Sequence, residues 1–289
     1  MQYPKITIVT PNFNKGKYLE STIKSILSQN YPNLEYIIID GGSTDNSIDI
    51  IKKYEKYLTY WVSEPDNGMY HAIQKGFNYS SGEIMAWLNS DDMYHPKSLF
   101  TVAEIFSQYS MVNWLIGASS FYDKTGRTVK VNRSRYYSRY NFLTGDWKWI
   151  QQETTFWRRN LWEKVNGLNH SLKLAGDFDL WLRFSRYDKM YITDALIGGF
   201  RMSDSEQLSD NMDEYINEVE MLIKNEPQSV YDKQKINDVK IRKFIIKLIS
   251  NIRVFNTYAI YLKLMKSEFQ ERENHHFSFN KELQKFILP

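Results

Sequence analysis

Apolar residues in the first half of the chain follow two alternating spacings. Short unbroken apolar runs are typical of strands that are buried on both faces of a parallel sheet, and they lie at residues 6–10, 36–39, 60–62 and 84–88. Between these runs, apolar residues recur every three or four positions, which predicts amphipathic helices. Strands alternating with helices predict an α/β fold with right-handed crossovers and a mostly parallel central sheet.

Each predicted strand ends in a polar loop. In an open α/β sheet, ligands bind beyond the carboxyl ends of the strands, so we expect Asn12, Asp40, Asp66 and Asp91 to converge on one edge. The neighbouring carboxylates of Asp91 and Asp92 repel each other, and a bound cation relieves that repulsion. Oxygen ligands suit Mg²⁺ or Mn²⁺. The alternative is a helix start, with Ser90 or Asp91 capping the segment that follows.

The second half is less regular. Residues 114–117 read as a strand, Gly126 lies in a predicted hairpin turn, and residues 178–182 have helical spacing. From about Asp210 the pattern is helical throughout. We therefore divide the chain into an α/β domain, residues 1–209, and a helical C-terminal extension, residues 210–289.

The extension is basic and amphipathic. Residues 233–266 contain nine Lys or Arg and one acid, above an apolar stripe that includes Ile241, Phe244 and Leu248. This pattern fits peripheral contact with an anionic membrane, packing onto the α/β domain, or pairing with another subunit in a homo-oligomer. Packing onto the domain is favoured because further aromatic residues follow. Nucleic acid is the poorest partner, because no recognised binding module accompanies the charge.

Composition narrows the chemistry. The chain has 289 residues, a net charge of +3 and no cysteine, which excludes disulfides, thiolate nucleophiles and Cys-ligated zinc. Four of its eight tryptophans, at 147, 149, 157 and 181, are expected to pack in the core rather than to form a sugar-stacking platform. Neither a signal peptide nor an apolar run long enough to span a bilayer is visible, so we expect a cytoplasmic protein, at most peripheral on the inner face of the membrane.

Five short motifs, in a fixed order across residues 5–200, together resemble a known family. They are Val9–Asn14, Ile39–Asp45, Ser63–Gly68, Leu88–Asp92 and Ala175–Trp181. In this order they are similar to the motifs of family 2 glycosyltransferases, inverting enzymes with a GT-A fold, a Rossmann-like sheet flanked by helices. Each motif is weak alone, and their succession is specific.

The resemblance implies a role for each matching residue in holding the donor. Pro11, Asn12 and Phe13 would wall the nucleotide base, Asp40 and its turn would contact the nucleoside, and Asp66 with Lys75 would close the pocket. In the acidic loop, Asn89 would contact the ribose beside Ser90, Asp91 would bind Mn²⁺ or Mg²⁺ on the diphosphate, and Asp92 would support it.

The last motif supplies the expected general base, Asp177, for which helix capping is the alternative role. Gln152 and Glu153 are candidates for contact with the acceptor sugar, although a polar edge-strand face would explain them as well. Two positions depart from the family pattern. Gly41 stands where many relatives carry an Asp, which leaves the base identity open, and Gly176 stands where many carry a Glu.

The implied activity is inverting transfer of a sugar from a nucleotide donor, with UDP-sugar favoured, to a hydroxyl of a glycan or lipid-linked acceptor in polysaccharide or cell-surface glycan synthesis. Two alternatives stay open. A sugar-phosphate nucleotidyltransferase has a similar sheet, but it usually needs a basic Gly-rich loop after the first strand, which residues 10–14 lack. A non-catalytic scaffold of a glycan-assembly complex would use the basic helices alone.

Overall fold

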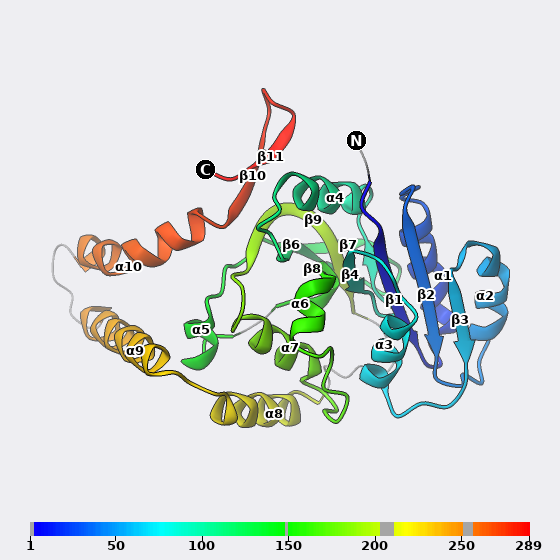
Figure 1. The fold of residues 1–289 in the computed structure, drawn as a ribbon, viewed down its shortest axis with the longest axis horizontal. Coiled ribbons are helices and arrows are strands. Elements are labelled where there is room, and N and C mark those ends of the chain that lie inside the picture. Colours follow the sequence, from blue (N-terminus) through cyan, green and yellow to red (C-terminus); the bar gives the residue numbers. More distant parts are fainter. Residues whose placement is uncertain (1–2, 148–149, 203–210, 251–256) are drawn as a thin grey trace.

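The fold is a mixed α/β arrangement around one sheet with helices on its faces (Figure 1). The computed structural model describes residues 3–147, 150–202, 211–250 and 257–289. The main path of the sheet has the strand order β11-β10-β9-β6-β8-β4-β1-β2-β3. Pairings of β3 with β2, β2 with β1 and β1 with β4 are parallel, as are those of β6 with β9 and β9 with β10. The predicted α/β class with a mostly parallel sheet is confirmed.

The first half consists of the predicted alternation of strands and helices. Its elements are β1 (Ile6–Asn12), α1 (Gly16–Leu27), β2 (Leu34–Asp40), α2 (Ser47–Tyr54), η1 (Glu55–Tyr57), β3 (Tyr60–Ser63), α3 (Met69–Asn78) and β4 (Ile84–Trp87). Helix α3 packs closely on the sheet because Gly76 has no side chain. A Cβ atom there would lie 2.5 Å from Val9 Cγ1. The tight packing holds the β3–α3 loop beside the ends of β1 and β2.

The second half widens the sheet. Its elements are β5 (Met93–Tyr94), α4 (Ser98–Gln108), β6 (Trp114–Tyr122), β7 (Thr128–Asn132), α5 (Arg139–Leu143), η2 (Gln152–Thr154), β8 (Thr155–Arg158), α6 (Arg159–Lys164), α7 (Gly176–Phe184) and β9 (Tyr191–Arg201). The predicted hairpin is confirmed, since β6 and β7 pair antiparallel and Gly126 has a φ of +88° in the turn. Strand β8 runs antiparallel to both neighbours, β4 and β6.

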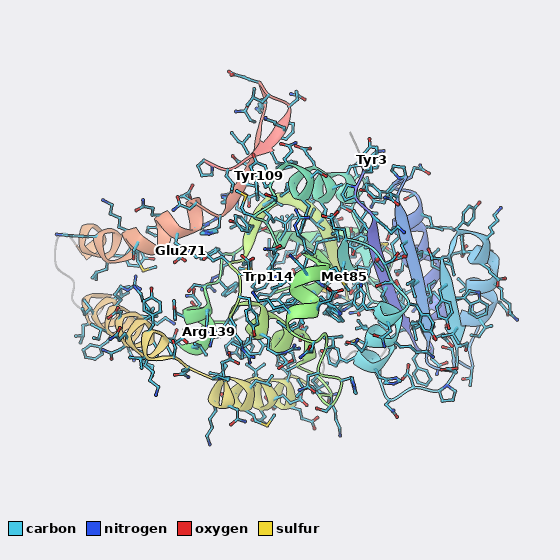
Figure 2. All side chains as sticks on the ribbon, in the orientation of Figure 1. Tyr3, Met85, Tyr109, Trp114, Arg139 and Glu271 are labelled. Carbon is cyan, nitrogen blue, oxygen red and sulfur yellow. The ribbon has the colours of Figure 1, made fainter. Side chains whose placement is uncertain are left out.

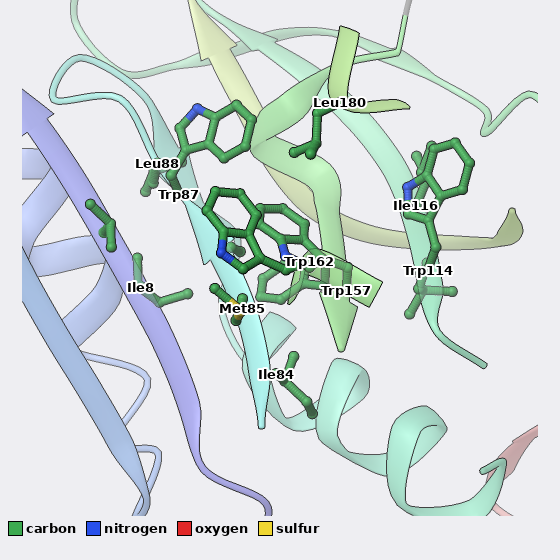
Figure 3. Packing of buried hydrophobic residues seen from close by; sticks show 14 of the residues in the cluster. Ile8, Ile84, Met85, Trp87, Leu88, Trp114, Ile116, Trp157, Trp162 and Leu180 are labelled. Atoms are coloured by element: carbon green, nitrogen blue, oxygen red, sulfur yellow. The ribbon is translucent and has the colours of Figure 1, made fainter. Parts of the chain in front are cut away.

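The core centres on tryptophans from four different elements. Trp87, Trp114, Trp157 and Trp181 are almost fully buried, and the rings of Trp87 and Trp181 stack with centroids 5.8 Å apart. Figure 3 shows Trp87, Trp114 and Trp157 in the packed interior between the strands. Trp147 is also buried, against Phe178. The prediction of core packing is confirmed for residues 147, 157 and 181, whereas Trp149 lies outside the described residues.

The C-terminal extension begins with α8 (Met212–Asn225), α9 (Val230–Ser250) and α10 (Thr257–Glu273). Its end is not helical, so the expectation of helix throughout is wrong for the last residues. There β10 (His276–Asn280) pairs parallel with β9, and β11 (Lys285–Ile287) pairs antiparallel with β10. Phe277 is fully buried. Burial of this ring and backbone pairing with β9 outweigh local helical preference.

One arginine ties the extension to the α/β domain. Arg139 on α5 forms ion pairs with Glu226 (Nη1–Oε1, 2.7 Å) and with Asp232 on α9 (Nε–Oδ1, 3.4 Å). Figure 2 labels Arg139 between α5 and the two yellow helices. Along the described part of the chain, the helices are too short or too polar to cross a bilayer.

Candidate active site

The carboxyl ends of β1 and β2 are joined by a hydrogen-bond network around Asp40. This carboxylate is fully buried and accepts bonds from Asn12 Nδ2 (2.6 Å), Ser43 Oγ (2.5 Å) and Ser63 Oγ (2.6 Å), and from the backbone N–H groups of Gly42 and Ser43. Of the four residues expected to converge on this edge, Asn12 and Asp40 are in direct contact. With five donors satisfied, Asp40 and Asn12 fix the shape of the loop.

An aromatic ring and an acid flank this loop at the surface. Phe13 is 60% exposed, and its ring lies 3.4 Å from the place where a Cβ at Gly41 would stand. Asp66 Oδ2 lies 2.9 Å from the same place. The missing side chain at Gly41 thus leaves room for the Asp66 carboxylate, which also accepts a bond from Gly68 N (2.7 Å). Lys75 on α3 pairs with Glu64.

The acidic loop after β4 contains two carboxyl groups in different surroundings. Asp91 Oδ2 lies 3.2 Å from Lys15 Nζ, at the start of α1. Asp92 is fully buried, and its Oδ1 accepts a bond from Arg201 N (2.8 Å). Burial, followed by repulsion from Asp91, raises the pKa of Asp92 well above its usual range. Asp92 thus anchors the loop to β9, whereas the Asp91 carboxylate faces Lys15.

The chemistry of the loop fits a Mg²⁺ or Mn²⁺ ion whose remaining ligands come from a diphosphate. Asn89 Oδ1 is buried without a hydrogen-bond partner beside Asp91. Within the described ranges, no group of three or more His, Cys, Asp or Glu side chains is placed to hold a metal. Mg²⁺ is commonly bound by one or two carboxylates together with substrate phosphates, so this sparse donor set is sufficient.

Asp177 lies in the first turn of α7, and its carboxyl group is surrounded by tyrosines. Its Oδ1 accepts hydrogen bonds from Tyr215 OH (3.4 Å) and from Phe178 N (2.7 Å). Tyr70 OH lies 3.5 Å from the same oxygen and donates its proton to Leu174 O (2.5 Å). Burial raises the pKa of Asp177 to about 6. The N-cap residue of α7 is Ala175, so capping does not account for Asp177. A carboxyl group with this pKa is well suited to general base catalysis near neutral pH.

The loop that carries Asp177 is held by helix α8. Glu218 accepts hydrogen bonds from the N–H groups of Lys173 (3.2 Å), Leu174 (3.0 Å) and Ala175 (2.8 Å). Tyr215, which reaches Asp177, lies one turn earlier on the same helix. Although the sequence pattern changes near residue 210, α8 is therefore a part of the site. A cavity of about 410 Å³ lies beside it, lined by Gly145, Trp147, Ile216, Glu220, Ile223 and Lys224.

Gln152 and Glu153 lie on η2 rather than on an edge strand. Glu153 is 3% exposed, and its charge interacts with those of both Asp177 and Asp91. Burial is the main cause that raises the pKa of Glu153 to about 8. Glu153 therefore lies within electrostatic reach of both Asp177 and Asp91.

Comparison with known proteins agrees with this geometry. The family model described as "Glycosyl transferase family 2" matches residues 7–168, more than half of the chain. The chain belongs to this family. Among its relatives, an uncharacterised glycosyltransferase of Mycobacterium tuberculosis is 30% identical over 185 residues, covering 62% of this chain and 68% of the relative. One of Rickettsia typhi is 25% identical over 209 residues, covering 70% and 65%.

Solved structures of glycosyltransferases share the GT-A fold of this family member. Staphylococcus aureus TarS in complex with UDP-GlcNAc has a TM-score of 0.64 at 16% identity, covering 93% of this chain and 81% of TarS. The mannosyltransferase PcManGT of Pyrobaculum calidifontis, in complex with GDP-Man and Mn²⁺, has a TM-score of 0.62 at 12% identity, with the same coverage. The resemblance to a GT-A glycosyltransferase is thereby confirmed.

Several residues of the site escaped prediction from sequence. Lys15 follows the first motif, but only the structure shows its ion pair with Asp91. Tyr70 lies just beyond the third motif, and its ring fills the space that a side chain at Gly176 would occupy, 2.8 Å from the Cβ position. Tyr215 and Glu218 belong to no motif. The sequence around Tyr70 and around Tyr215 contains no pattern from which their position near Asp177 could be predicted.

Proposed function

We propose that this glycosyltransferase moves a sugar from a nucleotide-sugar donor, with UDP-sugar favoured, to a hydroxyl of a glycan or lipid-linked acceptor, with inversion at the anomeric carbon. The observations that support the proposal are the Asp91 carboxylate beside Lys15 and the Asp177 carboxyl group beside Tyr215, with Glu153 near enough to interact with the charges of both acids. Such a site can hold the diphosphate on one side and a proton acceptor on the other. A single displacement then requires no nucleophile from the enzyme.

Asp177 is proposed as the general base. The acceptor hydroxyl gives its proton to the Asp177 carboxylate as its oxygen bonds to the anomeric carbon, and the bond to the diphosphate breaks on the opposite face. Proton transfer to a positioned base contributes about 10²–10⁴-fold to the rate. Tyr215 donates a hydrogen bond to Oδ1 of this carboxylate, which leaves its other oxygen for the acceptor.

The acidic loop and α1 are proposed to hold the diphosphate. Asp91, with Asn89 beside it, would carry Mn²⁺ or Mg²⁺, and a bound ion offsets negative charge on the departing diphosphate. Lys15 stands next to Asp91 and adds a positive charge at the same place. Phe13 and Asp66 both lie next to Gly41, and we place the nucleotide base against the exposed ring of Phe13.

The proposed preference for UDP and the proposed class of acceptor rest on similarity to other glycosyltransferases. TarS was solved with UDP-GlcNAc, whereas PcManGT was solved with GDP-Man, and Gly41 leaves the base-reading position open. We assign the chain to polysaccharide or cell-surface glycan synthesis because that is where the family resemblance leads. Trp147 and the cavity beside α8 lie next to Tyr215 and offer a route for the acceptor.

The basic helix α9 is proposed to contact an anionic membrane surface from the cytoplasmic side. Ile236 and Val239 are buried, so part of the helix packs onto the protein as expected. Ile241, Phe244 and Leu248 are 49%, 63% and 48% exposed along one stripe. Lys233, Lys240 and Lys247 recur every seven residues and flank this stripe. Exposed apolar side chains beside a row of lysines suit an interface with anionic lipids better than a protein core.

A thermal-shift screen of UDP-, GDP- and TDP-sugars, with and without Mn²⁺, tests the donor and the metal. Ligand-linked stabilisation grows with the ratio of ligand concentration to Kd, so the correct donor raises the Tm most. We expect a UDP-sugar to give the largest shift, and the Asp91→Asn variant to lose the part that depends on Mn²⁺. No shift with any nucleotide sugar would contradict the proposed function. An equal shift with and without Mn²⁺ would contradict the role of the metal alone.

A further inference from the structure

Segment η2 carries polar atoms that are buried without partners. Both amide atoms of Gln152 and Oε1 of Glu153 are in this state among the described residues. Buried polar atoms in native proteins are nearly always hydrogen-bonded, so each exception calls for an explanation. Three such atoms on two consecutive residues, facing a site, point to a ligand that provides the missing hydrogen bonds.

The backbone of η2 is rigidly placed. Thr154 N and Thr154 Oγ1 both bond to Gln151 O, at 3.2 Å and 2.9 Å. On the other side, Gly198 of β9 approaches so closely that a Cβ there would lie 2.2 Å from Glu153 O. Backbone contacts therefore hold the segment in place from both sides.

In the proposed reaction, Glu153 lies beside the transferred sugar. Its charge interacts with that of Asp177, the proposed base, and with that of Asp91, the proposed diphosphate side. Between a leaving diphosphate and a base, the group that must fit is the sugar being transferred. Sugar hydroxyls both donate and accept hydrogen bonds, as the amide and carboxyl groups of η2 require.

We propose that Gln152 and Glu153 form the donor-sugar subsite, where they hydrogen-bond the hydroxyl groups of the transferred hexose and select among nucleotide sugars. This inference rests on the proposed function and deepens it. It places both residues on the donor rather than on the acceptor, because Glu153 is almost completely shielded from solvent.

The same polar atoms without hydrogen-bond partners would make the site selective among donor sugars. A site that is built to hydrogen-bond a particular hydroxyl rejects a donor that lacks it, because the buried groups of the protein then stay unpaired. Because Gln152 and Glu153 both need hydrogen-bond partners, the affinity for a donor should depend on the position and orientation of the hydroxyl groups on its sugar ring. In this proposal, the nucleotide part of the donor does not contact Gln152 or Glu153.

The test compares a nucleoside diphosphate with its sugar conjugate. Isothermal titration with Mn²⁺ measures Kd for UDP and for whichever of UDP-glucose, UDP-galactose and UDP-GlcNAc binds wild type most tightly. The variants are Gln152→Met, which removes hydrogen bonding at similar volume, and Glu153→Gln. We expect each variant to bind the UDP-sugar about tenfold more weakly and to bind UDP within about twofold of wild type.

Glu35→Gln is the matched control. Glu35 is also buried, but its carboxylate is fully bonded to Thr7, Ser81 and Gly82 at the opposite end of the strands. This variant should lose stability and keep the affinity ratio of UDP-sugar to UDP. In contrast, Gln152→Met should be at least as stable as wild type, since it removes polar atoms that have no partner.

Three results would overturn the inference. Equal weakening of UDP and UDP-sugar would place η2 on the nucleotide or in the scaffold. Unchanged affinity for both ligands with a raised KM for the acceptor would place it on the acceptor. Failure of wild type to bind any of these nucleotides would instead contradict the proposed function, and this outcome is recognised before a variant is made.

Discussion

Individual residues of the site differ in how readily the sequence reveals them. Asp91 and Asp177 follow from short motifs because their chemistry demands a carboxylate at a strand end and at a helix start. Asp92 shows the limit of that reasoning. Its neighbour Asp91 faces Lys15, whereas Asp92 is buried against Arg201 and carries a strongly raised pKa. The sequence alone does not show which of two adjacent aspartates has the more deeply buried side chain.

At this scale the account predicts the pH dependence of transfer. Asp177 must be ionised to accept a proton, and burial raises its pKa to about 6. We therefore expect kcat/KM to fall as the pH drops through about 6 and to level off above it. A pH–rate profile of wild type measures this. An acidic limb near the ordinary pKa of aspartate would contradict the assignment.

Tyr215→Phe supplies the companion measurement. The Tyr215 hydroxyl donates a hydrogen bond to Asp177, which stabilises the carboxylate and lowers its pKa. Removing the hydroxyl should shift the acidic limb to higher pH while leaving the donor Kd unchanged. A limb at the wild-type position would show that Tyr215 does not act on the base.

Elements were predicted well where local pattern and burial agree. The alternation of strands and helices through β4 and the hairpin at Gly126 are both present in the structure. Segment η2 and strand β10 were not foreseen, since each depends on contacts with β9, a strand distant in sequence. Helix α8 is the clearest case. Its residues read as the start of an appendage, yet Glu218 holds the loop before Asp177.

Glu218→Gln tests this role of α8. The carboxylate accepts three backbone N–H groups, and an amide retains only one accepting oxygen, so we expect a loss of about 1–3 kcal/mol in the free energy of unfolding. Looser placement of Asp177 should lower kcat more than it raises the donor KM. Chemical denaturation and steady-state kinetics provide both values.

Glu214→Gln is the control for that experiment, because Glu214 is exposed on the same helix and lies outside the lining of the cavity. Its stability and kcat should stay close to those of wild type. If both variants behaved alike, the effect would belong to the charge of α8 rather than to the bonds that Glu218 makes.

On the scale of the whole molecule, the extension and the α/β domain are joined through Arg139, α8 and β10. The stripe of Ile241, Phe244 and Leu248 on α9 is exposed. What covers this stripe does not follow from the sequence, because the same apolar spacing fits a core, a second subunit or a lipid surface. The exposure of Phe244 in the structure separates the first of these from the other two.

Vesicle flotation tests the membrane proposal. We expect wild type to float with vesicles that contain phosphatidylserine, to stay behind with pure phosphatidylcholine, and to dissociate as salt screens the lysines. Phe244→Glu should reduce flotation severalfold. Val131→Glu, at an exposed position on β7, is the matched control and should float like wild type. Concentration-dependent dimerisation that Phe244→Glu abolishes, without flotation, would assign the stripe to a second subunit.

The most direct test of the central claim is a paired measurement on Asp177→Asn. Asparagine keeps the shape of the side chain and cannot accept the proton, so sugar transfer should fall by about 10²–10⁴-fold. The Kd of the nucleotide-sugar donor, measured in parallel by titration, should stay within about twofold of wild type. Transfer at the wild-type rate would contradict the site described here, whatever the donor and acceptor prove to be.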